Sequence, residues 1–258
     1  MEETGKNPIQ VAERLFQVIE RLAENGPMGI MDLSAELGFH KSTTHRLVTS
    51  LQYMGYIRQD EESLKYALSL KFLEIGSKIL EQTNMASLIH PSLKKLSEQT
   101  GETVYLVRRE GTEAVYIDKV ESTVSSIRMV SRVGSRIPLY CSGVGKALLA
   151  ELPDPEIEDI WNSSEITSLT PYTVTSLSDL MDRIRGVREA GYAMDDEENE
   201  EGVRCIAVSI PDYHKEPVYA LSISAPVSRM TDARIAELST DVLTFKKDLE
   251  KTLGFSRS

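Results

Sequence analysis

The sequence predicts an α+β protein that begins with a winged helix-turn-helix unit, continues through a linker helix and ends in a larger unit of strands and helices. Three observations predict this order. Apolar residues recur at steps of three and four over the first 54 residues. Two short strand-like segments then flank a polar turn. After residue 100, strand-like alternation is interleaved with helical periodicity.

Composition places the chain among ordinary folded proteins. It has 258 residues, 29 Lys plus Arg against 40 Asp plus Glu, a net charge of −11 and 41% hydrophobic residues, which excludes collagen, coiled-coil rods and disordered tails. Two cysteines are too few for a disulfide scaffold, so we expect a reducing compartment. Because no apolar leader and no run of about eighteen uncharged apolar residues is present, we expect a cytoplasmic protein that does not enter a membrane.

The first 54 residues predict three helices. Apolar side chains of residues 9–23 share one helical face, and Asn25, Gly26 and Pro27 end that helix. A short second helix ends at Gly38, which can take the left-handed conformation of a tight exit. The third helix begins near Lys41. Its expected inward side chains are Thr44, Leu47, Val48, Leu51 and Met54.

The outward face of the third helix carries small hydroxyls and cations. Its candidate DNA-contact residues are Lys41, Ser42, Thr43, His45 and Arg46. An α-helix fits the major groove, where such side chains reach base edges or phosphates. Residues 38–59 contain no carboxylate although the whole chain is acidic. We therefore expect this stretch to bind double-stranded DNA. The alternative is a structural three-helix domain whose polar face is only solvated.

A wing and a linker are predicted next. Residues 56–58 and 64–68 predict two short strands around a polar Asp-Glu-Glu-Ser turn, and Arg58 on this wing is expected to contact a phosphate. An apolar pattern interrupted by Gly76 then predicts a linker helix over residues 70–84. An ordinary amphipathic helix packed on its own domain is the alternative for this segment.

The remaining residues alternate between helical and strand-like patterns. Helices are expected over residues 88–100, 143–151, 176–190 and 231–253, and strands over 103–109, 114–120, 127–133, 203–210 and 217–224. Ser176 and Asp179 form a capping-box pattern at the start of one helix. The economical arrangement is a mixed sheet with helices packed against it.

Several polar features predict a ligand pocket in this second part. Residues 142–145 precede a helix, so their backbone N–H groups should be free to receive an anion. They are not a nucleotide-binding loop, because Tyr140 and Ala147 stand where that loop needs Gly and Ser or Thr. Ser222 and Ser224 share one face of a strand and can bond a carboxylate or hydroxyl. Residues 195–201 hold six carboxylates, most of which we expect to point to solvent.

Four segments of the chain resemble the IclR family of bacterial transcriptional regulators. These segments are residues 33–57, 137–152, 191–210 and 220–226. The first resembles the family's recognition segment, in which Gly, two further residues, Lys-Ser-Thr and Arg-Leu recur. Ser34 and Thr44 depart from the pattern, because such segments usually carry Ala and Val or Ile there.

The resemblance implies a winged helix-turn-helix DNA-binding domain over residues 1–69, a linker helix over 70–84 that helps to pair two chains, and a GAF-like mixed α/β effector-binding domain over 85–258. It implies an effector pocket formed by Met129, Gly143, Val144, Asp195, Cys205, Ser222 and Ser224. We therefore expect a small organic acid as effector, no cofactor, and a homodimer or dimer of dimers on a palindromic operator. Repression and activation of transcription both stay open.

Three alternatives accompany this interpretation. Cys205 would be the nucleophile of an enzyme, but the only His near it in sequence is His214, and a lone Cys in a strand is more often buried and inert. A metal site formed by Cys141, Cys205, His214 and Asp195 lacks any closely spaced pair of ligands. A module that only dimerises would bind neither DNA nor effector.

Overall fold

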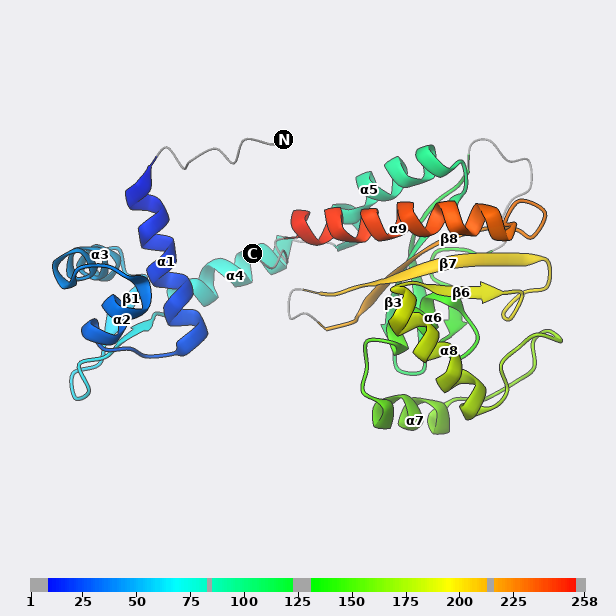
Figure 1. The fold of residues 1–258 in the computed structure, drawn as a ribbon, viewed down its shortest axis with the longest axis horizontal. Helices are drawn as coiled ribbons and strands as arrows, with labels where there is room; N and C mark the ends of the chain where they lie inside the picture. The colour runs from blue at the N-terminus through cyan, green and yellow to red at the C-terminus, as the bar shows by residue number, and fades with distance from the viewer. Residues whose placement is uncertain (1–8, 83–84, 123–130, 213–215, 254–258) are drawn as a thin grey trace. The chain divides into compact units, whose positions relative to one another are not determined.

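The computed structural model of the protein describes residues 9–82, 85–122, 131–212 and 216–253. The chain divides into two compact units, Met1–Thr83 and Asn84–Ser258. The secondary structure is α+β, as the sequence predicts (Figure 1). Among the described helices, none is long and apolar enough to cross a membrane.

Three helices form the core of the N-terminal unit: α1 (Gln10–Asn25), α2 (Ile30–Leu37) and α3 (Lys41–Tyr53). Gly38 ends α2 with a φ of 66°, which confirms the predicted left-handed exit. The two departures from the family pattern are buried hydroxyls that bond within their own helix. Ser34 Oγ donates to the Ile30 carbonyl at 2.7 Å, and Thr44 Oγ1 donates to the His40 carbonyl at 3.4 Å. Both helices therefore bury a hydroxyl without leaving it unsatisfied.

The predicted inward set of α3 is correct except for Met54. Thr44, Leu47, Val48 and Leu51 are buried, whereas Met54 is 38% exposed. The helix ends at Tyr53, so Met54 is its C-cap and no longer follows the helical repeat that the prediction extended.

The wing consists of β1 (Ile57–Gln59) and β2 (Tyr66–Leu68), paired antiparallel. Asp60 closes the turn between them, because its Oδ1 accepts from the Ser63 N–H at 2.8 Å. Met28 adds an isolated bridge on the other side of β2, with two backbone hydrogen bonds to Tyr66 of 3.0 and 2.8 Å. Helix α4 (Lys71–Gln82) follows the wing where the linker helix is predicted. Residues 83 and 84 lie outside the described part of the chain.

The C-terminal unit is built on a six-stranded sheet of order β5-β4-β3-β8-β7-β6. Its strands are β3 (Thr103–Glu110), β4 (Glu113–Val120), β5 (Arg136–Pro138), β6 (Ala193–Asp196), β7 (Val203–Ile210) and β8 (Tyr219–Pro226). Every strand pair described is antiparallel, so the prediction of a mixed sheet is wrong. Short turns join β3 to β4 and β6 to β7, and such connections produce antiparallel pairs.

Helices cover both faces of this sheet (Figure 1). On one face lie α5 (Met85–Thr100) and α9 (Asp232–Thr252), packed on apolar side chains such as Leu221 and Ile223. On the other face lie α6 (Gly143–Leu149), α7 (Asp154–Ser163) and α8 (Leu177–Ala190). Because side chains alternate along β8, Ser222 points to the same face as α6.

Some elements differ from the sequence-based predictions. Strands β5 and β6 and helix α7 were not predicted, since β5 and β6 have only three and four residues and Pro153 and Pro155 flank the start of α7. Proline in the first turn is compatible with a helix, because the N–H that it lacks is unpaired there in any case. Of the strand predicted over residues 127–133, residues 131–133 are irregular and the rest lies outside the described residues.

Candidate DNA interface and effector site

The polar face of α3 is open to solvent. Lys41, Ser42, His45 and Arg46 are exposed, and Thr43 is half-buried. Arg58 is exposed on β1. The opposite side of α3 carries Leu47, Val48 and Leu51, whose side chains are buried in the core of the unit. Their burial fixes the direction in which the polar side chains project.

The charges of α3 are not neutralised by the described part of the N-terminal unit. Ion pairs there engage Arg21 and Lys78 and leave Lys41 and Arg46 unpaired. The first turn of α3 holds no acidic residue, and the His40 side chain makes no capping hydrogen bond. The backbone N–H groups and the positive end of the helix dipole therefore reinforce the cations at this end of the helix.

The second predicted site lies on the α6 face of the sheet, where strand register aligns its side chains. Asp195 on β6 is opposite Cys205 on β7, and Cys205 is opposite Ser224 on β8. Residues directly opposite in an antiparallel pair project to the same face. Ser222 occupies the next position on that face, with its Oγ 3.4 Å from the Ser224 Oγ. The fold thus gathers four predicted pocket residues from three strands.

Helix α6 approaches this row of side chains through Gly143. A Cβ added at Gly143 would lie 2.7 Å from the Cys205 Sγ, so only glycine permits this approach. Val144, the next residue, is buried in the core. Met129 lies outside the described residues. The structure thus brings six of the seven predicted pocket residues to one region.

The expectation of free N–H groups at residues 142–145 is wrong in part. Helix α6 begins at Gly143, and Ser142 is its N-cap. The Gly145 N–H donates to the Ser142 Oγ at 3.1 Å, and that hydroxyl donates to the Pro138 carbonyl at 2.6 Å. The Ser142 side chain therefore satisfies part of the helix terminus that the sequence left open.

The acidic run points to solvent only in part, because Asp196 and Glu201 are exposed and Glu197 and Glu200 half-buried, whereas two of its carboxylates are buried. Asp195 and Glu198 are 6% and 2% exposed. The Asp195 Oδ1 accepts from the backbone N–H groups of Glu198 and Asn199 at 2.8 and 3.3 Å, which bends the chain after β6. Burial raises the pKa of Asp195 to about 7, and the charge of Glu198 adds to the rise while Lys146 opposes it.

A buried ion pair beside this bend was not predicted. Lys146 on α6 is 1% exposed, and its Nζ is bonded to the Glu198 Oε1. The Thr173 Oγ1 donates to the Glu198 carbonyl at 2.7 Å and holds the same residue from another side. One signal in the sequence pointed to the pair. Lys146 is the only charge in an otherwise apolar helix, and a buried lysine requires a partner.

Two tyrosines extend the polar face and were also not predicted. Tyr105 on β3 is opposite Ser222, and its ring centroid is 5.0 Å from that of Tyr116 on β4. Burial raises the pKa of both phenols, so both remain neutral donors at physiological pH. Strand register, which the sequence did not supply, brings them to this face.

The environment of Cys205 is unsuited to a nucleophile. Burial, reinforced by the charge of Asp195, raises the pKa of the thiol, whereas a reactive cysteine needs a lowered pKa. His214 lies outside the described residues. Within the described ranges, no three His, Cys, Asp or Glu side chains are grouped as a metal site would require.

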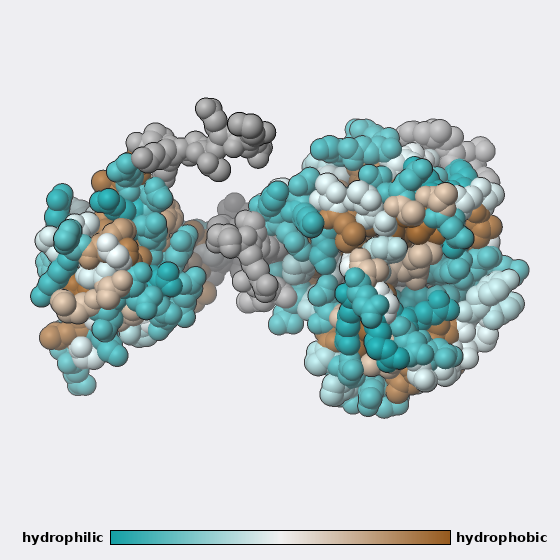
Figure 2. Space-filling model, in the orientation of Figure 1, coloured by the Kyte–Doolittle hydropathy of each residue, from teal (hydrophilic) through white to brown (hydrophobic). Residues whose placement is uncertain are grey.

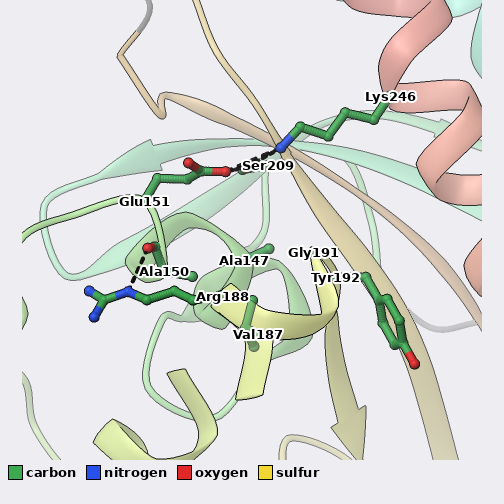
Figure 3. Close-up of a pocket in the computed structure, with 9 residues that line it drawn as sticks. All are labelled: Ala147, Ala150, Glu151, Val187, Arg188, Gly191, Tyr192, Ser209 and Lys246. Atoms are coloured by element: carbon green, nitrogen blue, oxygen red, sulfur yellow. Dashed lines mark hydrogen bonds and ion pairs between the residues drawn. The ribbon is translucent and has the colours of Figure 1, made fainter. Parts of the chain in front are cut away.

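Figure 3 shows a separate pocket of about 170 Å³, lined by residues of α6, α8, β7 and α9. Its polar groups pair with one another. The Lys246 Nζ lies 3.1 Å from the Glu151 Oε1 and 3.0 Å from the Ser209 Oγ, while the Arg188 Nε donates to the Ala150 carbonyl at 3.0 Å. None of the predicted effector residues lines this pocket.

These features define a class of protein: a winged helix-turn-helix protein that binds DNA, joined to a larger α/β domain with a polar site of its own. Comparison with protein families specifies it further. Residues 11–61 match the IclR helix-turn-helix domain, and residues 77–250 match the bacterial transcriptional regulator IclR C-terminal domain. The chain belongs to the IclR family, which confirms the resemblance and argues against the enzyme alternative.

Characterised relatives are similar over nearly the whole chain. The acetate operon repressor of Salmonella typhimurium is 36% identical over 252 residues, covering 96% of this chain and 92% of that protein. The transcriptional repressor IclR of Escherichia coli is 35% identical with the same coverage. The transcriptional regulator XynR of Escherichia coli is 36% identical over 248 residues, covering 96% and 98%.

Solved structures agree with the fold. The crystal structure of Thermotoga maritima IclR has a TM-score of 0.63 and 31% identity and covers 95% of this chain and 99% of that chain. A putative IclR regulator from a Silicibacter species has a TM-score of 0.81, covering 97% and 98%, although its identity is only 23%.

Proposed function

We propose that the protein is a transcriptional repressor that binds a palindromic operator as a homo-oligomer and responds to a small organic acid. The observation that carries the DNA-binding part is the unpaired polar face of α3, held outward by its buried side. Repression is inferred from the relatives named repressors in Salmonella typhimurium and Escherichia coli.

In this proposal α3 is the recognition helix. Arg46 and Lys41 contact base edges or phosphates from within the major groove, with Ser42, Thr43 and His45 beside them. Arg58 on the wing contacts the phosphate backbone. These roles agree with the exposure of the side chains and with the absence of carboxylates from residues 38–59.

Pairing of two chains is supported by exposed apolar side chains on the N-terminal unit. Leu70 and Leu73 beside and on α4 are 81% and 66% exposed, and Phe16 on α1 is 61% exposed. Apolar patches interrupt the mostly hydrophilic surface of both units (Figure 2). Side chains of this kind are covered when a second copy packs on them. A homodimer or a dimer of dimers would place two recognition helices on successive major grooves.

The effector site is the polar row on the α6 face of the sheet. Ser222 and Ser224 supply hydroxyl donors to an acid, and Gly143 lets the start of α6 lie against Cys205. Asp195, with its pKa near 7, accepts a hydrogen bond when ionised and donates one when protonated. This combination favours an acid that also carries a hydroxyl group.

The DNA-binding part is tested by selecting operator duplexes from random DNA with the wild-type protein. Affinity is then measured by fluorescence anisotropy. Arg46→Ala should weaken binding by about tenfold or more, the loss of 1–3 kcal/mol expected for a base or phosphate contact. Arg185→Ala, which removes the same charge from the surface of α8, should bind as the wild type does. Equal affinity of Arg46→Ala and wild type would refute the assignment of α3.

The effector part is tested with a thermal-shift screen of small hydroxy and oxo acids. An acid that binds only the folded state raises the melting temperature. The double variant Ser222→Ala and Ser224→Ala should lose this shift while its operator affinity stays unchanged. A preserved shift in that variant would remove the two serines from the site.

A further inference from the structure

Two residues at the start of α4 bond three consecutive carbonyls that follow the recognition helix. The Lys71 Nζ donates to the Met54 carbonyl at 2.6 Å, and the Ser69 Oγ donates to the Gly55 carbonyl at 2.6 Å. The Ser69 N–H donates to the Tyr56 carbonyl at 2.9 Å. We name Ser69, Lys71 and residues 54–56 the α3–α4 joint.

The end of α3 explains why these carbonyls are available. The Tyr56 N–H bonds the Leu51 carbonyl at 2.9 Å, and the Gly55 N–H bonds the Gln52 carbonyl at 2.9 Å, with Gly55 at a φ of 79°. This pattern is a Schellman motif, which satisfies the carbonyls inside the helix but not those just beyond it. The α4 side of the joint supplies the missing donors.

Lys71 has two further roles in the joint. Its ammonium group lies at the C-terminal end of α3, where the helix dipole favours a cation, and 4.3 Å from the centroid of the Tyr56 ring. The neighbouring Phe72 ring packs on Tyr56 with centroids 5.2 Å apart. Ser69 also accepts the Lys71 N–H at 3.2 Å and so caps the start of α4. Hydrogen bonds, charge and ring packing thus fix α4 relative to α3.

We propose that Lys71 is a positioning residue for DNA recognition, which sets the angle between the recognition helix and α4 through the α3–α4 joint. The inference rests on the proposed pairing of two chains on a palindromic operator. Leu70 and Leu73 flank Lys71 and are exposed, so a second copy that covers them holds the first turn of α4. The joint then determines the separation and direction of the two recognition helices.

The distinguishing measurement is discrimination between operators that differ only in half-site spacing. The selected operator is compared with the same duplex lengthened by two base pairs between its half-sites, which rotates one half-site by about 70° relative to the other. The wild type should bind the longer duplex at least about tenfold more weakly, because only a fraction of molecules place both helices correctly.

Lys71→Met keeps the alkyl chain and removes the ammonium group. It should bind the selected operator about five- to tenfold more weakly than the wild type does. It should also retain no more than about threefold discrimination between the two duplexes, because the angle between α3 and α4 is then no longer fixed and fits both spacings. Lys78→Met, which removes the same charge from an exposed position on α4, should behave as the wild type does. Arg46→Ala should weaken binding to both duplexes equally and keep the wild-type ratio.

If Lys71 only stabilised the fold, Lys71→Met would lower the melting temperature without changing the ratio of the affinities for the two duplexes. Circular dichroism shows whether Lys71→Met is folded, and Ser69→Ala serves as the second variant with the same expected loss of discrimination. If a folded variant still discriminated between the two duplexes as the wild type does, the proposed positioning role of the joint would be refuted. If the wild type showed no preference for either spacing, the proposed pairing of recognition helices would be refuted, and the proposed role of the joint with it.

Discussion

Replacing Lys146 by Met removes the positive partner of a fully buried carboxylate. Both side chains of the Lys146–Glu198 pair are 2% exposed. The Glu198 Oε2 has no hydrogen-bond partner among the described residues, so Lys146 provides its main compensation. The charge of Lys146 also lowers the pKa of Asp195. The substitution therefore leaves two buried carboxyl groups without the cation that stabilises their ionised forms.

The magnitude follows from this arrangement. Removal of one partner of a buried pair costs about 3–5 kcal/mol, and we expect Lys146→Met to lie in that range. Glu198→Gln should cost less, about 2 kcal/mol, because Asp195 remains close enough to compensate Lys146. The double variant should be more stable than the sum of the two losses predicts, by at least about 1 kcal/mol, since no uncompensated charge of the pair remains.

The chain provides its own probe for this measurement. Its single tryptophan, Trp161 on α7, packs against Tyr140 with ring centroids 6.0 Å apart in the core of the C-terminal unit. Urea unfolding followed by Trp161 fluorescence at pH 7 therefore reports on the unit that contains the pair. Strictly additive losses in the two single variants would refute the energetic coupling of Lys146 with Glu198.

Further predictions concern the same unit and the same fluorescence assay. Because the folded pKa of Asp195 is about 7, above its ordinary value of 3.8, its contribution to stability is largest at low pH and is lost as the pH rises from about 4 to 7. Between pH 5 and pH 8 the free energy of unfolding of the wild type should therefore fall by on the order of 2 kcal/mol more than that of Asp195→Asn. Identical pH dependence of unfolding in the two proteins would contradict the raised pKa. Gly145→Ala should destabilise the unit by about 3 kcal/mol or more, because the added Cβ would lie 2.1 Å from the Leu139 carbonyl oxygen. Gly186→Ala, inside α8 with no atom within 4 Å of the new Cβ, should instead stabilise it by about 0.5–1 kcal/mol. A tolerated Gly145→Ala would show that α6 can move away from residue 139.

The N-terminal unit could be predicted closely because its signals are local. Helical periodicity predicts three helices, Gly26 and Gly38 mark the ends of the first two, and the carboxylate-free stretch contains the exposed face of α3. The prediction that Met54 is buried was wrong because it continued the helical repeat past the residue at which α3 ends. The α3–α4 joint could not be predicted either, since its side-chain hydrogen bonds connect residues that are 14 and 17 positions apart.

The C-terminal unit could be predicted in its longer elements but not in its register. The row from Asp195 through Cys205 to Ser224 exists because three strands pair in one register, and a shift by one residue would turn these side chains to the opposite face. Tyr105 was missed for that reason. Glu198 was missed because runs of carboxylates are usually solvated, and only the fold brings the side chain of Lys146 to it.

The measurement that tests the central claim most directly is hydrogen–deuterium exchange of the full chain with and without the selected operator duplex. Binding through the polar face of α3 should slow exchange in residues 41–50 and in the wing around Arg58, while Arg46→Ala at the same duplex concentration shows less protection. Protection confined to the C-terminal unit, or unchanged exchange in residues 41–50 at saturating duplex, would contradict the account.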